Sequence, residues 1–135
     1  MTSANELQYG GDHYKTAGPQ HWDVIDQYGY PYLEGCATKY LLRHHKKNGR
    51  EDLQKAHHFV IKIIEQTQKM PKQIRAPADE LIAPDEVRRQ LIDASGLEDG
   101  DLRACVFGLL GPVDLPQLYS IESLIHSAID RIYPA

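Results

Sequence analysis

Apolar side chains recur every three or four positions along most of this chain, which is the spacing of one face of an α-helix. The first such segment covers residues 20–28 and ends at a glycine and a proline. Its apolar positions are Trp22, Ile25 and Tyr28. Because Val24 and Ile25 are neighbours, only one of them can point inward with Trp22, and the three-residue step favours Ile25.

Two longer amphipathic helices follow, joined by Asn48-Gly49, a pair that tolerates the left-handed backbone at a helix end. The helix before this turn begins near Pro31. Its apolar stripe consists of Leu33, Cys36, Ala37, Tyr40 and Leu41. Its polar stripe consists of Lys39, Arg43, Lys46 and Lys47. The helix after the turn has Leu53, Ala56, Val60, Ile63 and Ile64 inward, and Asp52, Lys55 and Lys62 on its polar edge. In an antiparallel hairpin, residues whose numbers sum to roughly 98 face each other, so Arg43 approaches Lys55 and Lys46 approaches Asp52.

Prolines then interrupt the pattern over residues 68–84, which predicts a linker. Helical spacing resumes at residues 85–94, 102–110 and 116–133, and the last segment has a wide apolar face that needs a partner surface. No strand pattern stands out. The predicted fold is therefore all-α, with a short N-terminal loop, an antiparallel helical hairpin, a Pro-rich linker and C-terminal helices.

The net charge of −4 conceals a division between the two halves of the chain. Residues 1–75 hold eleven Lys and Arg against eight Asp and Glu, a balance of +3, whereas residues 76–135 hold four Arg against eleven acids, a balance of −7. We therefore predict a basic helical region at residues 1–75 that binds an anionic ligand, and an acidic helical region at residues 76–135 of unknown role. The simpler alternative is that the two charged surfaces only attract each other.

Several other kinds of site find little support in the sequence. Cys36 and Cys105 are the only cysteines, neither in a Cys-x-x-Cys pair, and Cys36 fits the core better than a reactive site. Neither a P-loop nor a Rossmann glycine motif occurs. The pairs His44-His45 and His57-His58 could meet across the hairpin, but no acidic residue flanks them in a known ligand order, so we predict no metal site.

A series of short motifs in the first half resembles a known phage family. In chain order they are Gly10-Gly11-Asp12-His13-Tyr14-Lys15, Trp22-Asp23-Val24-Ile25, Leu33-Glu34-Gly35, Lys39-Tyr40 with Arg43, Lys47-Asn48-Gly49, Glu51-Asp52-Leu53 and Lys55-Ala56. Over residues 9–66 this string is similar to the small phage domain called SaV-like. A member of that family in short-tailed coliphages is a nucleotide kinase that phosphorylates deoxynucleoside monophosphates. The resemblance thus implies a nucleotide kinase that uses a nucleoside triphosphate as phosphate donor.

Phosphoryl transfer requires a protein to align donor and acceptor and to neutralise phosphate charge. Under the kinase hypothesis the catalytic cations are Arg43, through its bidentate fork, with Lys39 and Lys55 as point charges. The expected substrate-binding residues are Gly10, Gly11, His13, Tyr14, Lys15, Tyr40, Lys47 and Asp52. Trp22 could stack a base, as could Tyr14 or Tyr40, although Trp22 fits a core position better. For Asp52, structural pairing with a cation is a better fit than metal binding.

Two other functions could use the same basic region. A non-catalytic protein that captures nucleotides, including signalling nucleotides of host defence, needs the pocket but no transfer step. A helical DNA-binding module is the third hypothesis, which the acidic total disfavours. Base preference and any need for a divalent ion stay open.

The expected setting is the cytoplasm of an infected bacterial host. The sequence shows no cationic start followed by an apolar run, and no apolar stretch of membrane-spanning length, so we expect no membrane association. Because short hairpins rarely supply a full core, we expect a homo-oligomer.

Overall fold

The computed structural model describes residues 18–69 and 82–135, and over these residues the prediction of an all-α chain is confirmed. The elements in chain order are α1 (His21–Gln27), α2 (Tyr32–Arg43), the 3-10 turn η1 (His44–Lys46), α3 (Arg50–Lys69), α5 (Asp85–Ser95), α6 (Gly100–Leu109) and α7 (Leu115–Ile132). Residues 1–17 of the predicted N-terminal loop and residues 70–81 of the predicted linker lie outside the described residues.

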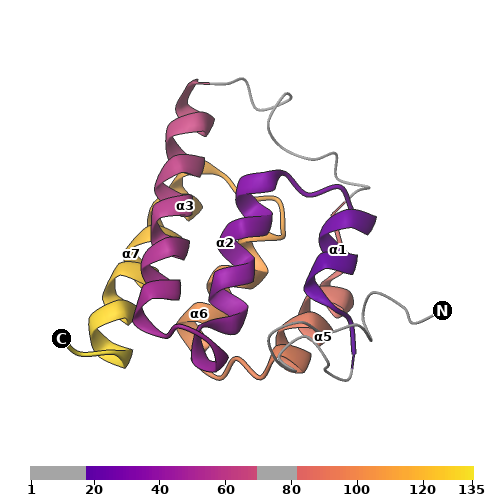
Figure 1. Cartoon of the computed structure of the whole chain (residues 1–135). Coiled ribbons are helices and arrows are strands. Elements are labelled where there is room, and N and C mark those ends of the chain that lie inside the picture. The colour runs from indigo at the N-terminus through magenta and orange to yellow at the C-terminus, as the bar shows by residue number, and fades with distance from the viewer. Residues whose placement is uncertain (1–17, 70–81) are drawn as a thin grey trace.

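The predicted hairpin of α2 and α3 is present and stands near the middle of the molecule (Figure 1). Its turn follows the sequence signal, because Gly49 has a φ of +58° and its N–H donates to the carbonyl of His44 at 2.9 Å. Tyr40 stacks on Phe59 across the hairpin, with ring centroids 5.9 Å apart. The facing residues therefore lie close to the predicted register.

A single cluster of buried apolar side chains joins the described parts of both halves of the chain. α7 packs along α3 and against α6, while α6 also contacts α2 and α5 (Figure 1). The wide apolar face of the last helix is thus covered within the same chain. Its fully buried members include Leu118, Ile125 and Ala128.

The inward faces of α1 and α2 differ from those predicted. On α1 the prediction that Ile25 points inward in preference to its neighbour was wrong, since Val24 is only 3% exposed and Ile25 is half-buried against Gly35. On α2, Thr38 and Leu42 are buried while Cys36 is only half-buried. The reason is that α2 has helices on several sides, so its buried residues do not follow one stripe.

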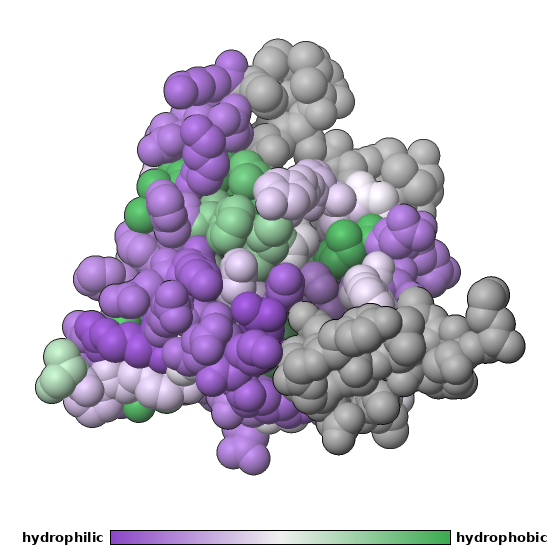
Figure 2. All heavy atoms as spheres, in the orientation of Figure 1, coloured by the Kyte–Doolittle hydropathy of each residue, from purple (hydrophilic) through white to green (hydrophobic). Residues whose placement is uncertain are grey.

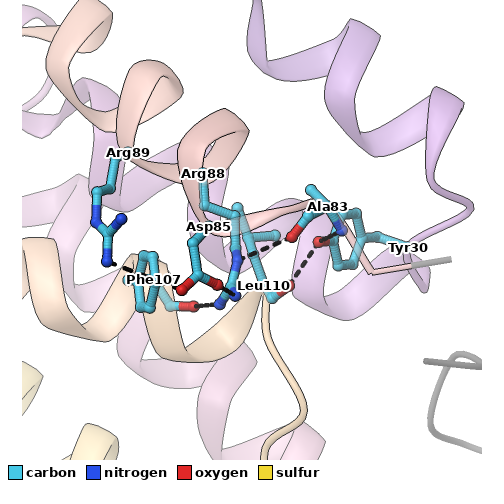
Figure 3. A network of polar contacts seen from close by, with 7 residues as sticks. All are labelled: Tyr30, Ala83, Asp85, Arg88, Arg89, Phe107 and Leu110. Carbon is cyan, nitrogen blue, oxygen red and sulfur yellow. Dashed lines mark hydrogen bonds and ion pairs between the residues drawn. The ribbon is translucent and has the colours of Figure 1, made fainter. Parts of the chain in front are cut away.

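A polar network around the buried Arg88 and Tyr30 joins three segments that are distant in sequence (Figure 3). The guanidinium of Arg88 donates to the carbonyls of Ala83 at 3.0 Å and Phe107 at 2.9 Å, and it pairs with Asp85. The hydroxyl of Tyr30 accepts from the N–H of Ala83 at 2.9 Å and donates to a carbonyl of the α6 end. This network attaches the start of α5 to the end of α6 and to the loop before α2.

The outer face over α2 and α3 is largely hydrophilic, with an apolar area between the two helices (Figure 2). Among the described helices, none combines the length and apolar character needed to cross a bilayer.

Replacing Arg88 with alanine should lower the free energy of unfolding by about 2–4 kcal/mol, because buried carbonyls lose their donors. Urea denaturation measures this change. Arg89→Ala is the matched control: its side chain is 65% exposed, so its effect should stay within about 0.5 kcal/mol. Equal effects of the two substitutions would contradict the structural role given to Arg88.

Candidate functional site

Three cations predicted from the sequence meet around one aromatic ring. The centroid of the Tyr40 ring lies 4.8 Å from Cζ of Arg43, 5.5 Å from Nζ of Lys39 and 5.4 Å from Nζ of Lys55. Two of these residues belong to α2 and one to α3, so the hairpin brings them together. We call these four residues the cation–tyrosine cluster. The negative face of the ring partly offsets the repulsion among the cations.

Asp52 contacts this cluster through Arg43. Its carboxylate is fully buried in the first turn of α3, where Oδ2 accepts from the N–H of Asn48 at 3.2 Å and lies 3.4 Å from Nε of Arg43. The prediction that Asp52 lies on the polar edge was therefore wrong. The reason is that a carboxylate in this position can accept from the turn and pair with the guanidinium at once. Asp52 therefore forms an ion pair with Arg43.

A pocket of about 350 Å³ opens beside the cluster, with walls from α1, α2, η1 and α5. Its lining residues are Pro19, Gln20, His21, Trp22, Lys39, Leu42, Arg43, Lys46, Leu91 and Ser95. Three of them are cations on the α2 and η1 wall, and none of these described lining residues is acidic. We call this space the cationic pocket. It offers positive charge beside apolar walls, which favours an anion attached to an apolar group.

Trp22 lines the cationic pocket from α1, whereas the cations line it from α2 and η1. The prediction that it fits the core was wrong, since 48% of its surface is exposed and it lines the cationic pocket. α1 directs Val24 inward instead, which leaves the indole at the pocket edge. An exposed indole beside a cationic surface is suited to stacking on a planar ring.

His21 supplies a neutral polar group at the same wall. Burial lowers the pKa of His21 to about 4, and the nearby Lys39 ammonium adds to the shift. Its Nε2 lies 2.8 Å from Oγ1 of Thr38. The hydroxyl of Thr38 already donates to backbone carbonyls of α2, so Nε2 of His21 is the donor in this contact. The neutral ring then presents Nδ1 as an acceptor.

The structure brings together only part of the predicted site. Lys39 and Arg43 belong to both the cluster and the cationic pocket, whereas Tyr40 and Lys55 belong to the cluster alone. Lys47 is exposed after η1 and lines no part of the pocket. The remaining predicted residues, Gly10, Gly11, His13, Tyr14 and Lys15, lie outside the described residues.

Sequence reasoning placed no site role on Lys46, His21 or the α5 residues. Lys46 had a signal, because positions 39, 43 and 46 follow one helical face. No sequence signal indicated a site role for His21 or Ser95, since their positions depend on how α1 and α5 pack beside α2.

The histidine pairs of the hairpin take part in structural contacts. Nδ1 of His44 lies 2.7 Å from the hydroxyl of Tyr133, and Nε2 of His57 lies 3.0 Å from a carboxylate oxygen of Glu122. Burial lowers the pKa of His44 to about 4, with a smaller contribution from His45. No cluster of three or more His, Cys, Asp or Glu side chains is arranged to hold a metal ion within the described part of the chain.

Comparison with known families finds a match, which covers part of this chain. The family model described as a protein of unknown function, DUF3310, matches residues 9–61. The matched segment contains α1, α2 and the first part of α3, which carry the cation–tyrosine cluster. No curated protein and no solved structure matches the chain.

Acid should destabilise the fold through His21 and His44. Both have folded-state pKa values of about 4, below the value of 6.5 for an unfolded histidine, so protons bind the unfolded chain first. Their stabilising effect is complete above pH 6.5 and is lost as the pH falls toward 4. The free energy of unfolding, measured in urea, should therefore decrease from pH 7 to pH 5.

Substituting either histidine with glutamine should flatten this pH dependence. For each protein, the free energy of unfolding is expressed relative to its value at pH 8. This subtraction removes the pH-independent effect of losing the side chain. A slope that both variants share with the parent protein would contradict the assignment.

The charge of Asp52 should be essential to the hairpin. Asp52→Asn keeps the shape of the side chain but leaves Arg43 without its buried counter-charge, and it should cost about 3 kcal/mol of folding stability. Glu51→Gln is the matched control, since it removes the same charge from a neighbour whose side chain is 64% exposed. Denaturant titration of both variants distinguishes a buried pair from a general charge effect.

Proposed function

We propose that this protein binds nucleotides through the cationic pocket. The observation that carries the proposal is that Lys39, Arg43 and Lys46 line one pocket together with Trp22, whose surface is 48% exposed. A nucleotide has the matching two-part chemistry, with an anionic phosphate chain and a planar base. The charge-assisted contacts would form next to the apolar side chains of Leu42 and Leu91, where they are stronger than in open water.

The favoured activity is that of a nucleotide kinase acting on deoxynucleoside monophosphates. An oxygen of the acceptor phosphate forms a new bond to the γ-phosphorus of a nucleoside triphosphate, while the bond from that phosphorus to the β–γ bridging oxygen breaks. The bridging oxygen leaves with the donor, so two diphosphates result. The acceptor oxygen is already ionised at neutral pH, so the step needs charge neutralisation and alignment more than a general base.

Two arguments support this activity. Nε of Arg43 lies 3.4 Å from the buried carboxylate of Asp52, and the planar fork of a guanidinium matches the geometry of phosphate oxygens. The resemblance of the first half of the chain to the SaV-like family, one member of which is a nucleotide kinase, points to the same chemistry.

Nucleotide capture without catalysis is the second candidate. It is favoured by the lack of an acidic side chain among the described residues that line the pocket, since kinases usually hold their metal ions with carboxylates. Incubation with a labelled nucleoside triphosphate and a deoxynucleoside monophosphate distinguishes the two. Diphosphate formation supports the kinase, and stoichiometric binding of unchanged ligand supports capture.

Removing the pocket cations should weaken triphosphate binding under either candidate. Lys39→Ala and Lys46→Ala should each raise the dissociation constant about tenfold, because each removes one charge-assisted contact. Arg43→Lys keeps the charge beside Asp52 but loses the fork, so turnover should decrease more than affinity. Fluorescence of Trp22, the only tryptophan, measures binding directly.

Lys62→Ala is the control for these variants. Lys62 lies on the same helix as Lys55, is 48% exposed and pairs with Glu65, away from the pocket lining. An effect of Lys62→Ala as large as that of Lys39→Ala would mean that binding reflects general surface charge, and it would contradict the proposed site.

A further inference from the structure

A second pocket shares a wall with the cationic pocket. It has a volume of about 440 Å³ and lies between α1, the loop after it and the first half of α2. His21, Trp22 and Lys39 line both spaces, so these three side chains form the partition between them. The remaining residues of the second pocket are Ile25, Asp26, Gly29, Tyr30, Tyr32, Gly35 and Cys36.

The chemistry of this second pocket differs from that of its neighbour. Its lining includes three aromatic residues: Tyr32 is 76% exposed, Trp22 is 48% exposed, and Tyr30 is buried. Lys39 is the only cation among the described lining residues, and Asp26 is the only acid. Two of the lining residues, Gly29 and Gly35, carry no side chain. Such a site suits a planar ring that carries one anionic group near Lys39.

We propose that the second pocket is the acceptor subsite and binds a nucleoside monophosphate, with its base among the aromatic side chains and its phosphate toward Lys39. This inference rests on the proposed function, in which the cationic pocket holds the polyphosphate of the donor. The division follows from the charges, since three cations face the first pocket and one faces the second. Among the described lining residues, Lys39, in the partition, is the one cation that borders both pockets.

The chain contains a built-in reporter for this subsite. Cys36 is half-buried and lines the second pocket, whereas Cys105, the only other cysteine, is fully buried. Burial also raises the pKa of the Cys105 thiol to about 12, so it reacts little with thiol reagents near neutral pH. Alkylation by N-ethylmaleimide, followed by intact-mass spectrometry, therefore measures access to the second pocket.

The experiment compares ligands on the unmodified full chain. A deoxynucleoside monophosphate at ten times its dissociation constant should slow alkylation of Cys36 about tenfold, because it occupies the pocket that Cys36 lines. Inorganic tripolyphosphate should bind the cationic pocket and leave the alkylation rate unchanged. Cys36→Ser confirms which thiol reacts.

Two single-pocket variants make the assignment sharper. Tyr32→Ala alters only the second pocket and should weaken binding of the monophosphate, while affinity for tripolyphosphate stays unchanged. Lys46→Ala alters only the cationic pocket and should have the opposite pattern. The change in Trp22 fluorescence on titration measures the affinity for each of the two ligands.

The outcomes separate this inference from the proposed function. If triphosphate changes the fluorescence of Trp22 but no monophosphate protects Cys36, the acceptor subsite is wrong and nucleotide binding stands. If tripolyphosphate protects Cys36 as well as the monophosphate does, the two pockets are one site and the subsite assignment is wrong. If no nucleotide changes either signal, both proposals fail.

Discussion

The buried carboxylate of Asp52 is the constraint on which the rest of this structure depends. A charge without exposure to water is costly unless it is paired and hydrogen-bonded. Oδ2 of Asp52 accepts from the turn N–H of Asn48 and lies 3.4 Å from Nε of Arg43, which offsets part of this cost, whereas Oδ1 has no hydrogen-bond partner among the described residues. One side chain thereby joins the end of α2, the turn and the start of α3. The same contact limits the orientation of Arg43, which lies over Tyr40 and faces the cationic pocket.

The acidic half of the chain contributes to the cationic pocket through α5, although its net charge is negative. Its carboxylates pair largely with arginines, as in Asp93 with Arg103 and Asp99 with Arg131. The described lining of the cationic pocket receives from α5 only the uncharged side chains of Leu91 and Ser95. The acidic region therefore completes the pocket wall without placing a described carboxylate in the lining.

The sequence was informative wherever a local rule decides the structure. Helical spacing and the Asn48-Gly49 pair predicted the hairpin, and the register put Lys39, Arg43 and Lys55 within reach of one another. It was uninformative where the decision is made by packing between segments. Nothing in the spacing shows that Asp52 is buried, because its burial depends on a guanidinium nine residues earlier. The burial of Arg88 is equally unpredictable from spacing, since one of its acceptors, the carbonyl of Phe107, belongs to another helix.

The position of Trp22 also depends on packing between segments and could not be predicted from helical spacing. Period alone assigned Trp22 to the core, but a short helix of seven residues can bury only a few side chains, and α1 buries Val24. The indole is then left between two spaces, with Lys39 opposite it in the same partition. An aromatic ring and an ammonium group at one boundary allow two ligands to be held side by side, each with its ring near the indole and its charge near the cation. That arrangement depends on α1 leaning against α2 and on α5 closing the far wall, and no single stretch of the sequence encodes it.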